Sequence, residues 1–289
     1  MARAPRVCFV TCLAWPGVSE SDGHVQRALE RRGVAVDGIP WNDPAATFAG
    51  FDAVIFRSSW DYHHAPEAYL EWLARWEADG VRFWNAPALV RWNLSKRYLL
   101  DLDRAGVPII PTMIVERDGP TDLPALMAAR GWARVVVKPL LSASAHDAVL
   151  VTAEAAAEVS AEVDAGRLRR PIMVQPFADE IRTRGEWSLV FVDGALTHAV
   201  LKRPAPDDFR VQPRFGGSSV PSDPPADVAA AGRRAIDALP LPPLYARVDG
   251  IPTDSGFRVM EVELHEPGLF FPAAPAAAET FAEAIMRRL

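Results

Sequence analysis

The sequence has few cysteines, no excess of positive charge and no long apolar run, and each of these lacks argues against a class of protein. Its two cysteines, Cys8 and Cys12, have no accompanying cluster of cysteine or histidine, which argues against a zinc site and a disulfide-stapled fold. With 31 Lys and Arg against 37 Asp and Glu, the net charge of -6 gives no support for nucleic-acid binding. No apolar segment approaches the ~20 residues that span a bilayer, and no signal peptide is visible. We therefore expect a cytoplasmic protein that binds neither nucleic acid nor membrane.

What is present is enough apolar residues for one or two sizeable cores, 49% of 289 residues. The first third alternates between strands, at 6–13, 34–40 and 52–56, and helices, at 19–32 and 66–78. This order predicts a parallel sheet, whose ligands lie beyond the carboxyl ends of the strands. The polar and aromatic cluster at 57–62 follows the third strand, so it is a candidate substrate site.

The rest of the chain changes to an antiparallel pattern, so that the predicted class is α/β with an α+β C-terminal part. Helices are expected at 93–105, 122–130 and 154–164, and strands at 135–139, 148–152 and 172–177. Two hairpins follow, the first turning at Asp193-Gly194 and the second at 254–256. Ala-rich helices are expected at 225–239 and 276–288.

The second hairpin carries three acidic residues in a pattern that suggests a metal site. Glu261 and Glu263 are two residues apart on one strand and point to the same face, where Asp249 of the neighbouring strand can meet them. Carboxylates gathered on one face repel one another unless a cation neutralises them, and oxygen ligands of this kind suit Mg²⁺. The alternative is that one of them faces solvent or pairs with Arg247 or Arg258.

Several cations precede this hairpin. Lys138 ends an apolar strand just before a loop of small residues that begins at Ser142, and Lys96 lies in an earlier helical stretch. Lys202, Arg203 and Arg210 cluster after the first hairpin. Each is weak evidence alone, but together they could balance a triphosphate and its metal ions.

The order of these pieces resembles the ATP-grasp superfamily. The resemblance is to the branch that holds bacterial glutathione synthetase, the ribosomal-protein glutamate ligases and the cyclo-ligase that closes D-cycloserine from O-ureido-serine. The segment RVDGIPTDSGFRVMEVELHEPGLF resembles the metal hairpin of this family, with Glu263 standing where relatives usually have Asn. The likeness covers about residues 93–289, and the preceding part resembles only a generic leader domain.

The resemblance implies an ATP-grasp fold with three parts: a leader domain at 1–92, a first lobe at 93–172 and a second lobe with the metal site at 173–289. It implies ATP and Mg²⁺ as cofactors. The metal ligands would be Asp249, Glu261 and Glu263, and the catalytic cations Arg247, Lys202 and Arg210. The ATP-binding residues would be Lys96, Lys138, Ser142, Ser144, the hinge Val174, Gln175, Pro176 and Phe177, and Glu180 for the ribose. The loop from Ser142 lacks the glycines usual in the family.

The substrate is expected between the leader domain and the last lobe. The candidate residues there are Trp15, Arg57, Ser59, Trp60, Asp61, Tyr62, His265 and Glu266. For the cluster at 57–62, packing against the neighbouring domain is an alternative role.

The leading hypothesis is an ATP-dependent ligase that joins a carboxylate to a nitrogen through an acyl phosphate. Its substrate would be a small amino-acid-like molecule, with ring closure as one form of the reaction. One alternative is a ligase that adds an amino acid to a protein or peptide tail. Another is a nucleotide-binding regulator without turnover. A homodimer is possible, since dimers are common among the relatives.

Overall fold

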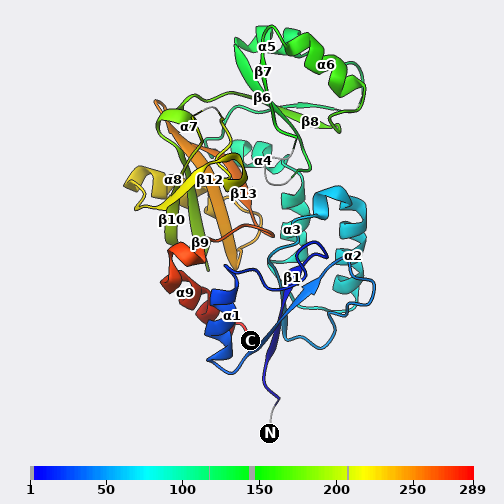
Figure 1. Ribbon diagram of the computed structural model, residues 1–289, viewed down its shortest axis with the longest axis vertical. Helices are drawn as coiled ribbons and strands as arrows, with labels where there is room; N and C mark the ends of the chain where they lie inside the picture. Colours follow the sequence, from blue (N-terminus) through cyan, green and yellow to red (C-terminus); the bar gives the residue numbers. More distant parts are fainter. Residues whose placement is uncertain (1–2, 117, 143–146, 207) are drawn as a thin grey trace.

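The computed structural model describes residues 3–116, 118–142, 147–206 and 208–289. The strands in this part of the chain form three sheets. The middle third of the chain lies at one end of the long axis, and both termini lie towards the other (Figure 1). No helix in the described ranges is long and apolar enough to cross a membrane.

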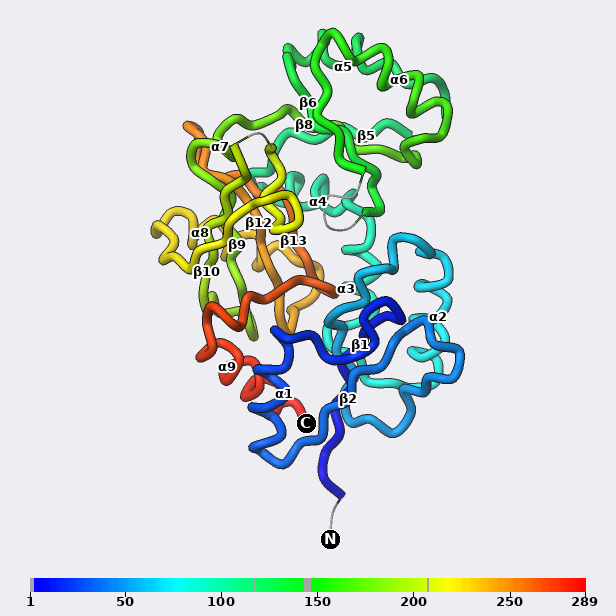
Figure 2. The backbone as a smooth tube through the Cα atoms, in the orientation of Figure 1, coloured from blue at the N-terminus to red at the C-terminus, as the bar shows by residue number. Residues whose placement is uncertain are grey.

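The first sheet is parallel, as predicted, and its strand order is β2-β1-β3-β4. Its strands are β1 (Arg6–Thr11), β2 (Ala35–Pro40), β3 (Ala53–Phe56) and β4 (Phe83–Trp84). Alternate residues of β1 face opposite sides. Val7 and Phe9 pack with α1 (Gly23–Glu30) and α9 (Pro275–Met286), and Cys8 and Val10 pack with α2 (Pro66–Ala78). Helix α9 lies beside α1 (Figure 2), so the end of the chain closes onto its beginning.

The second sheet is antiparallel, with the order β5-β8-β6-β7. It consists of β5 (Met113–Val115), β6 (Arg134–Pro139), β7 (Val149–Thr152) and β8 (Ile172–Pro176). In β6, Val135 and Val137 are buried with residues of α5 (Leu123–Arg130) and α6 (Ala156–Asp164). Lys138 therefore projects from the opposite face of the strand.

The third sheet is antiparallel, with the order β11-β10-β9-β12-β13. Its strands are β9 (Glu186–Val192), β10 (Ala195–Arg203), β11 (Ser218–Pro221), β12 (Tyr245–Thr253) and β13 (Gly256–Glu263). Asp193 and Gly194 both have positive φ, at 53° and 76°, which confirms the predicted turn between β9 and β10. One face of the sheet packs on α8 (Ala226–Asp237). The short elements α7 (Glu180–Thr183), η1 (Tyr62–His64), η2 (Pro213–Phe215) and η3 (Phe271–Ala273) complete the described chain.

A β-bulge in β13 decides which way its acidic residues point. Asp249 pairs with Glu261, but the next residue, Gly250, pairs with Val259, so Met260 is an extra residue in β13. Val259 and Val262, three residues apart, therefore both pack into the core against α8. Without this extra residue, Glu261 would share the core face with Val259.

The prediction of a single helix at 93–105 is wrong. The structure has α3 (Pro87–Leu94) and α4 (Tyr98–Arg104), with Ser95 in an extended conformation between them. The Lys96 N–H donates to the carbonyl of Leu140 at 3.0 Å, just after β6. A continuous helix would direct this N–H to its own preceding turn, so the tertiary contact breaks the helix.

The division into domains at 92 and 172 stays a prediction. The strands of the three sheets lie within 6–84, 113–176 and 186–263. Strand β8, at Ile172–Pro176, lies across the second predicted boundary.

The bulge can be tested with the substitution Gly250→Ala. A Cβ atom at Gly250 would lie 2.5 Å from the Arg258 carbonyl oxygen and 2.5 Å from the Phe257 ring. We expect Gly250→Ala to lower the free energy of unfolding by about 1–3 kcal/mol through overpacking. Denaturant unfolding measures the change. Gly17→Ala is the control, because a Cβ there meets nothing within 4 Å. Equal stabilities of the two variants would contradict the bulge.

Candidate active site

A cavity of about 360 Å³ is lined by residues that lie in, or next to, each of the three sheets. Trp60 comes from the loop after β3, Val136 and Lys138 from β6, and Gln175 from β8. The third sheet and the loop that follows it supply most of the charged residues of the lining: Glu186, Lys202, Arg247, Asp249, Glu261, Glu263 and Glu266. Most of the residues predicted to carry chemistry therefore line one space.

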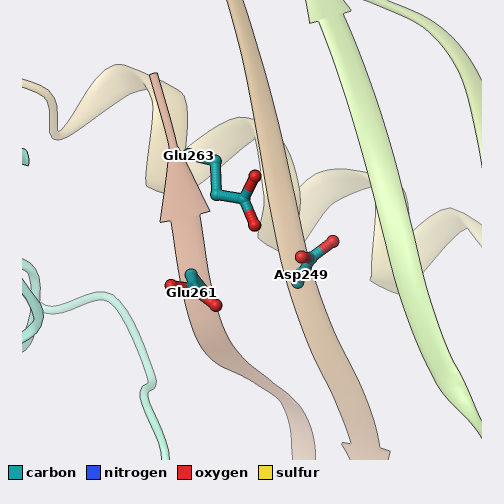
Figure 3. Close-up of side chains that lie close together, drawn as sticks. All are labelled: Asp249, Glu261 and Glu263. Carbon is teal, nitrogen blue, oxygen red and sulfur yellow. The ribbon is translucent and has the colours of Figure 1, made fainter. Parts of the chain in front are cut away.

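The three predicted metal ligands lie together on the cavity face of β12 and β13 (Figure 3). Asp249, Glu261 and Glu263 each offer a carboxylate oxygen, and these oxygens lie within 4.8 Å of one another. Asp249 is buried, and the two glutamates are half-buried. The sequence prediction that these side chains converge is confirmed.

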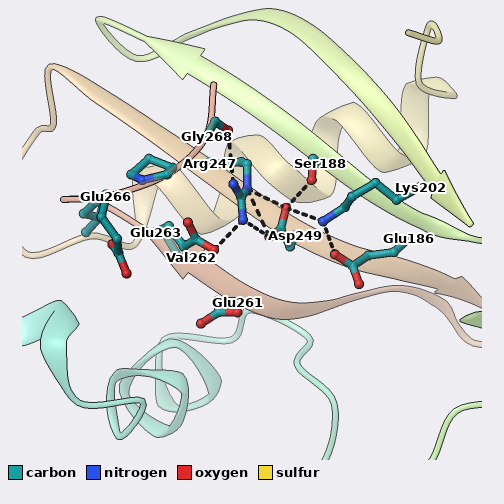
Figure 4. A network of polar contacts seen from close by, with 12 residues as sticks. Glu186, Ser188, Lys202, Arg247, Asp249, Glu261, Val262, Glu263, Glu266 and Gly268 are labelled. Carbon is teal, nitrogen blue, oxygen red and sulfur yellow. Dashed lines mark hydrogen bonds and ion pairs between the residues drawn. The ribbon is translucent and has the colours of Figure 1, made fainter. Parts of the chain in front are cut away.

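Each of the three carboxylates is paired with a cation. Lys96 forms an ion pair with Glu261. Arg247 forms ion pairs with Glu263 and, at 2.8 Å, with Asp249 (Figure 4). The alternative considered from the sequence was that one of these carboxylates pairs with Arg247. Such pairing does occur, but the three carboxylates also converge. Because neither Lys96 nor Arg247 is exposed, these contacts are not screened by solvent as surface pairs are.

A second pair extends the network along β9 and β10. Lys202 is buried and forms an ion pair with Glu186, and its Nζ lies 3.6 Å from Asp249. The Ser188 hydroxyl donates to Asp249. Neither Glu186 nor Ser188 was selected from the sequence. Their signal was available, since the two residues are polar at alternate positions of an otherwise apolar strand.

The charges of the neighbours shift the pKa values of the acidic residues in opposite directions. Burial alone would raise the pKa of Asp249, but Arg247 and Lys202 outweigh it and lower that pKa to about 2. Burial raises the pKa of Glu263 well above its usual value, because the charge of Arg247 is opposed by nearby carboxylates, Glu266 first among them. The network is therefore short of positive charge around Glu263.

The two predicted phosphate lysines lie in different electrostatic settings. Burial would lower the pKa of Lys96, but its pair with Glu261 outweighs burial and raises it. Burial lowers the pKa of Lys138, and the nearby Lys96 charge lowers it further. Within the described residues, no ion pair of Lys138 is found. Its charge is thus available to an anion in the cavity.

The predicted hinge residues are only partly in the cavity lining. Gln175, Pro176 and Phe177 line it, together with Ser142. Val174 is instead buried in the core of the second sheet. Glu180 lies in α7 between Ala178 and Ile181, which do line the cavity, but Glu180 itself does not. Ser144 lies outside the described residues.

Arg210 lines the cavity from the loop after β10. Its guanidinium pairs with Asp208 at 2.8 Å and lies 3.5 Å from the centre of the Phe215 ring. These two contacts hold the Arg210 side chain in place in the cavity lining. Sequence analysis did not select Asp208 or Phe215.

Of the predicted substrate residues, the structure brings only two into the cavity lining. These are Trp60 and Glu266, while Trp15, Arg57, Ser59, Asp61, Tyr62 and His265 lie outside it. The exposed Trp15 packs edge-on against Trp60, with ring centres 5.4 Å apart. The Asp61 carboxylate accepts hydrogen bonds from Trp41 and Asn42, and the Ser59 hydroxyl contacts that of Tyr69. The Tyr62 ring packs edge-on against His265.

The loop after β13, residues 264–269, is fixed by side chains from many parts of the fold. Each of its six carbonyls accepts a side-chain hydrogen bond. In chain order from Leu264, the donors are Asn85, Tyr245, Trp60, Arg57, Arg247 and His198. Arg57 and Trp60 therefore position this loop. Such a role is not visible in sequence, because the partners lie up to 210 positions away.

Comparisons with known proteins support a family assignment. Residues 7–85 match the family described as the N-terminal domain of D-cycloserine synthetase DcsG, and residues 108–224 match the ATP-grasp domain of prokaryotic glutathione synthetase. The cycloserine biosynthesis protein DcsG of Streptomyces lavendulae is 32% identical over 271 residues, which is 89% of this chain and 90% of that protein. The chain belongs to the ATP-grasp family.

A second sequence relative and a solved structure support the same family assignment. The glutathione synthetase of Parasynechococcus marenigrum is 30% identical over 239 residues, covering 76% of this chain and 73% of that protein. The crystal structure of D-cycloserine synthetase DcsG superposes with a TM-score of 0.86 at 29% identity, covering 98% of this chain and 99% of that one. As a member of this family, the protein is an ATP-dependent ligase that forms a carbon–nitrogen bond.

The positioning role of Arg57 can be tested by stability. Its guanidinium is buried, pairs with Asp22 at 2.9 Å and donates to the Pro267 carbonyl. We expect Arg57→Met to lower the free energy of unfolding by about 3–5 kcal/mol, because it leaves a buried carboxylate without its partner. Arg6→Met, which breaks the exposed pair with Asp37, should cost about 0–1 kcal/mol. Thermal unfolding of both variants compares them, and a loss for Arg57→Met as small as that for Arg6→Met would contradict the role.

Proposed function

We propose that this ATP-grasp ligase activates the carboxylate of a small amino-acid-like substrate as an acyl phosphate, with Mg²⁺ held by Asp249, Glu261 and Glu263. The observation that supports this proposal is the convergence of three carboxylates beside a cavity lined by lysines. The donor set suits the metal, because Mg²⁺ prefers oxygen ligands and commonly uses one or two carboxylates together with phosphate oxygens and waters. When bound, the metal would neutralise phosphate charge.

We propose that ATP lies across the cavity with its phosphates near Lys96, Lys138 and Lys202. Lys138 at the end of β6, for which the described residues provide no ion pair, and the neighbouring Ser142 fit this end. Ser144, which lies outside the described residues, is proposed as a further phosphate contact. The adenine would lie against backbone groups of 174–177 and the side chains of 175–177, and Glu180 would take the ribose hydroxyls.

In the first chemical step, a substrate carboxylate oxygen attacks the γ-phosphorus of ATP, the bond to the bridging oxygen breaks, and ADP leaves. The reacting groups are anions, so this chain contributes mainly positioning and positive charge. Lys202 and Arg210 would neutralise the transferred phosphoryl group. Both line the cavity, and Lys202 is fixed by Glu186.

In the second step, a nitrogen nucleophile attacks the acyl carbon, loses a proton, and inorganic phosphate leaves. Arg247 would stabilise the oxyanion of the tetrahedral adduct. Its position fits, because it is buried in the cavity wall between Asp249 and Glu263. The relative named for cycloserine biosynthesis supports a nitrogen within the same substrate molecule, and hence ring closure, as one form of this reaction.

We further propose a leader domain at 1–92 and two lobes at 93–172 and 173–289 that close on ATP. We also propose a cytoplasmic location, since the reaction consumes ATP. A homodimer stays a prediction.

The metal assignment predicts that the variant Glu261→Gln, which keeps the size of the side chain, loses ligase activity. We expect ADP release with an accepted substrate to fall at least about 100-fold, and the Mg²⁺ concentration for half-maximal rate to rise, because a charged ligand is lost. Glu71→Gln, on the exposed face of α2, changes the net charge equally and should behave like wild type. Undiminished turnover by Glu261→Gln would remove the assignment.

A further inference from the structure

One carboxylate in the cavity lacks the cationic partner that its neighbours have. Glu186, Asp249, Glu261 and Glu263 all form ion pairs with lysine or arginine. In the described part of the chain, the fifth carboxylate of the lining, Glu266, has no such pair. Glu266 lies against His265 rather than a lysine or arginine, and because a buried carboxylate without a permanent cationic partner is costly, its presence calls for a ligand.

Glu266 is 8% exposed, and its oxygen Oε2 is buried without a hydrogen-bond partner within the described ranges. This oxygen lies 3.1 Å from Nδ1 of His265, which itself lacks a hydrogen bond at either ring nitrogen in that part of the chain. Within the described residues, hydrogen-bonding capacity is therefore left unused beside a side chain that lines the cavity.

The backbone around Glu266 holds it in place. Tyr245, Trp60 and Arg57 donate to the carbonyls of residues 265, 266 and 267, at 3.2, 2.9 and 2.9 Å. Because its backbone is fixed on both sides, Glu266 is already in place in the lining. Ligand binding therefore does not carry the free-energy cost of ordering this loop. Such preorganisation is what a recognition site requires.

The surroundings of Glu266 indicate which cation it binds. The rings of Trp60 and Phe270 line the same cavity. Aromatic faces attract an organic ammonium group, but they offer no oxygen ligands to Mg²⁺. In Figure 4, Glu266 lies on the Glu263 side of Arg247, and Lys202 lies on the other side. An ammonium group at Glu266 would thus be separated by Arg247 from Lys202, one of the three lysines proposed to hold the phosphates.

We propose that Glu266 binds the α-ammonium group of the substrate, so that the enzyme selects amino acids over carboxylates that differ only by lacking this group. The inference rests on the proposed function and deepens it. With the amine at Glu266, the substrate carboxylate points towards Arg247 and the phosphates. Trp60 serves twice, since its ring forms the wall of the subsite and its indole N–H holds the Glu266 carbonyl.

The test uses pairs of carboxylates with and without the amino group: O-ureido-serine and its counterpart without the α-amine, serine and β-hydroxypropanoate, alanine and propanoate, each amino acid in both enantiomers. ADP release gives kcat/KM for each member. For wild type, we expect an active amino acid to exceed its partner by about 10- to 100-fold, the size of a hydrogen bond to a charged group. In Glu266→Gln this ratio should fall towards one.

Glu71→Gln is the matched control and should keep the ratio of wild type. Calorimetric binding of a nonhydrolysable ATP analogue with Mg²⁺ should be the same in Glu266→Gln and wild type, which shows that the variant is folded. A wild-type ratio near one, or a ratio that Glu266→Gln retains, overturns the subsite. So does a changed Mg²⁺ requirement with an unchanged ratio, which would make Glu266 a metal ligand. If no carboxylate of either set releases ADP while the analogue binds, the proposed function fails, and the subsite fails with it.

Discussion

The structure depends on one electrostatic constraint, which is that three carboxylates on the β12–β13 hairpin share one small space. Their oxygens lie within 4.8 Å of one another in a partly buried setting, so like-charge repulsion must be offset. Lys96 and Arg247 provide this offset within the chain. Arg247 lies on β12 within the hairpin, whereas Lys96 reaches Glu261 from the segment between α3 and α4. The requirement for neutrality therefore ties that segment to the hairpin.

The fold satisfies this constraint with a few local irregularities. The extra residue Met260 rotates the end of β13 so that its glutamates face the cavity. The break between α3 and α4 brings Lys96 to Glu261 and ties its backbone to Leu140. The loop at 264–269 is held by six side-chain donors and presents Glu266. Together, these irregularities bring Lys96, the two glutamates of β13 and Glu266 to one cavity.

The sequence was sufficient for the parallel first sheet, the hairpins and the acidic trio, because alternation and turn residues are local signals. It was not sufficient for the bulge, although apolar residues at 257 and 259 followed by 262 and 264 do show the change of phase. The break at Ser95 could not be predicted, since its cause is a contact with Leu140 in another part of the fold. For the same reason, Arg57 was expected to contact substrate, whereas it is buried against Asp22 and holds Pro267. The missing loop glycines do not require the alternative of a nucleotide-binding regulator without turnover. The family assignment and the charged cavity lining support a ligase instead.

The most direct test of the central claim is a crystal grown with a nonhydrolysable ATP analogue and Mn²⁺ in place of Mg²⁺, measured at the manganese absorption edge. Anomalous density located between Asp249, Glu261 and Glu263, in contact with the analogue's phosphate oxygens, is the predicted result. Analogue bound in the cavity with no anomalous peak at these carboxylates, or with Arg247 and Lys96 as their only partners, would contradict the account.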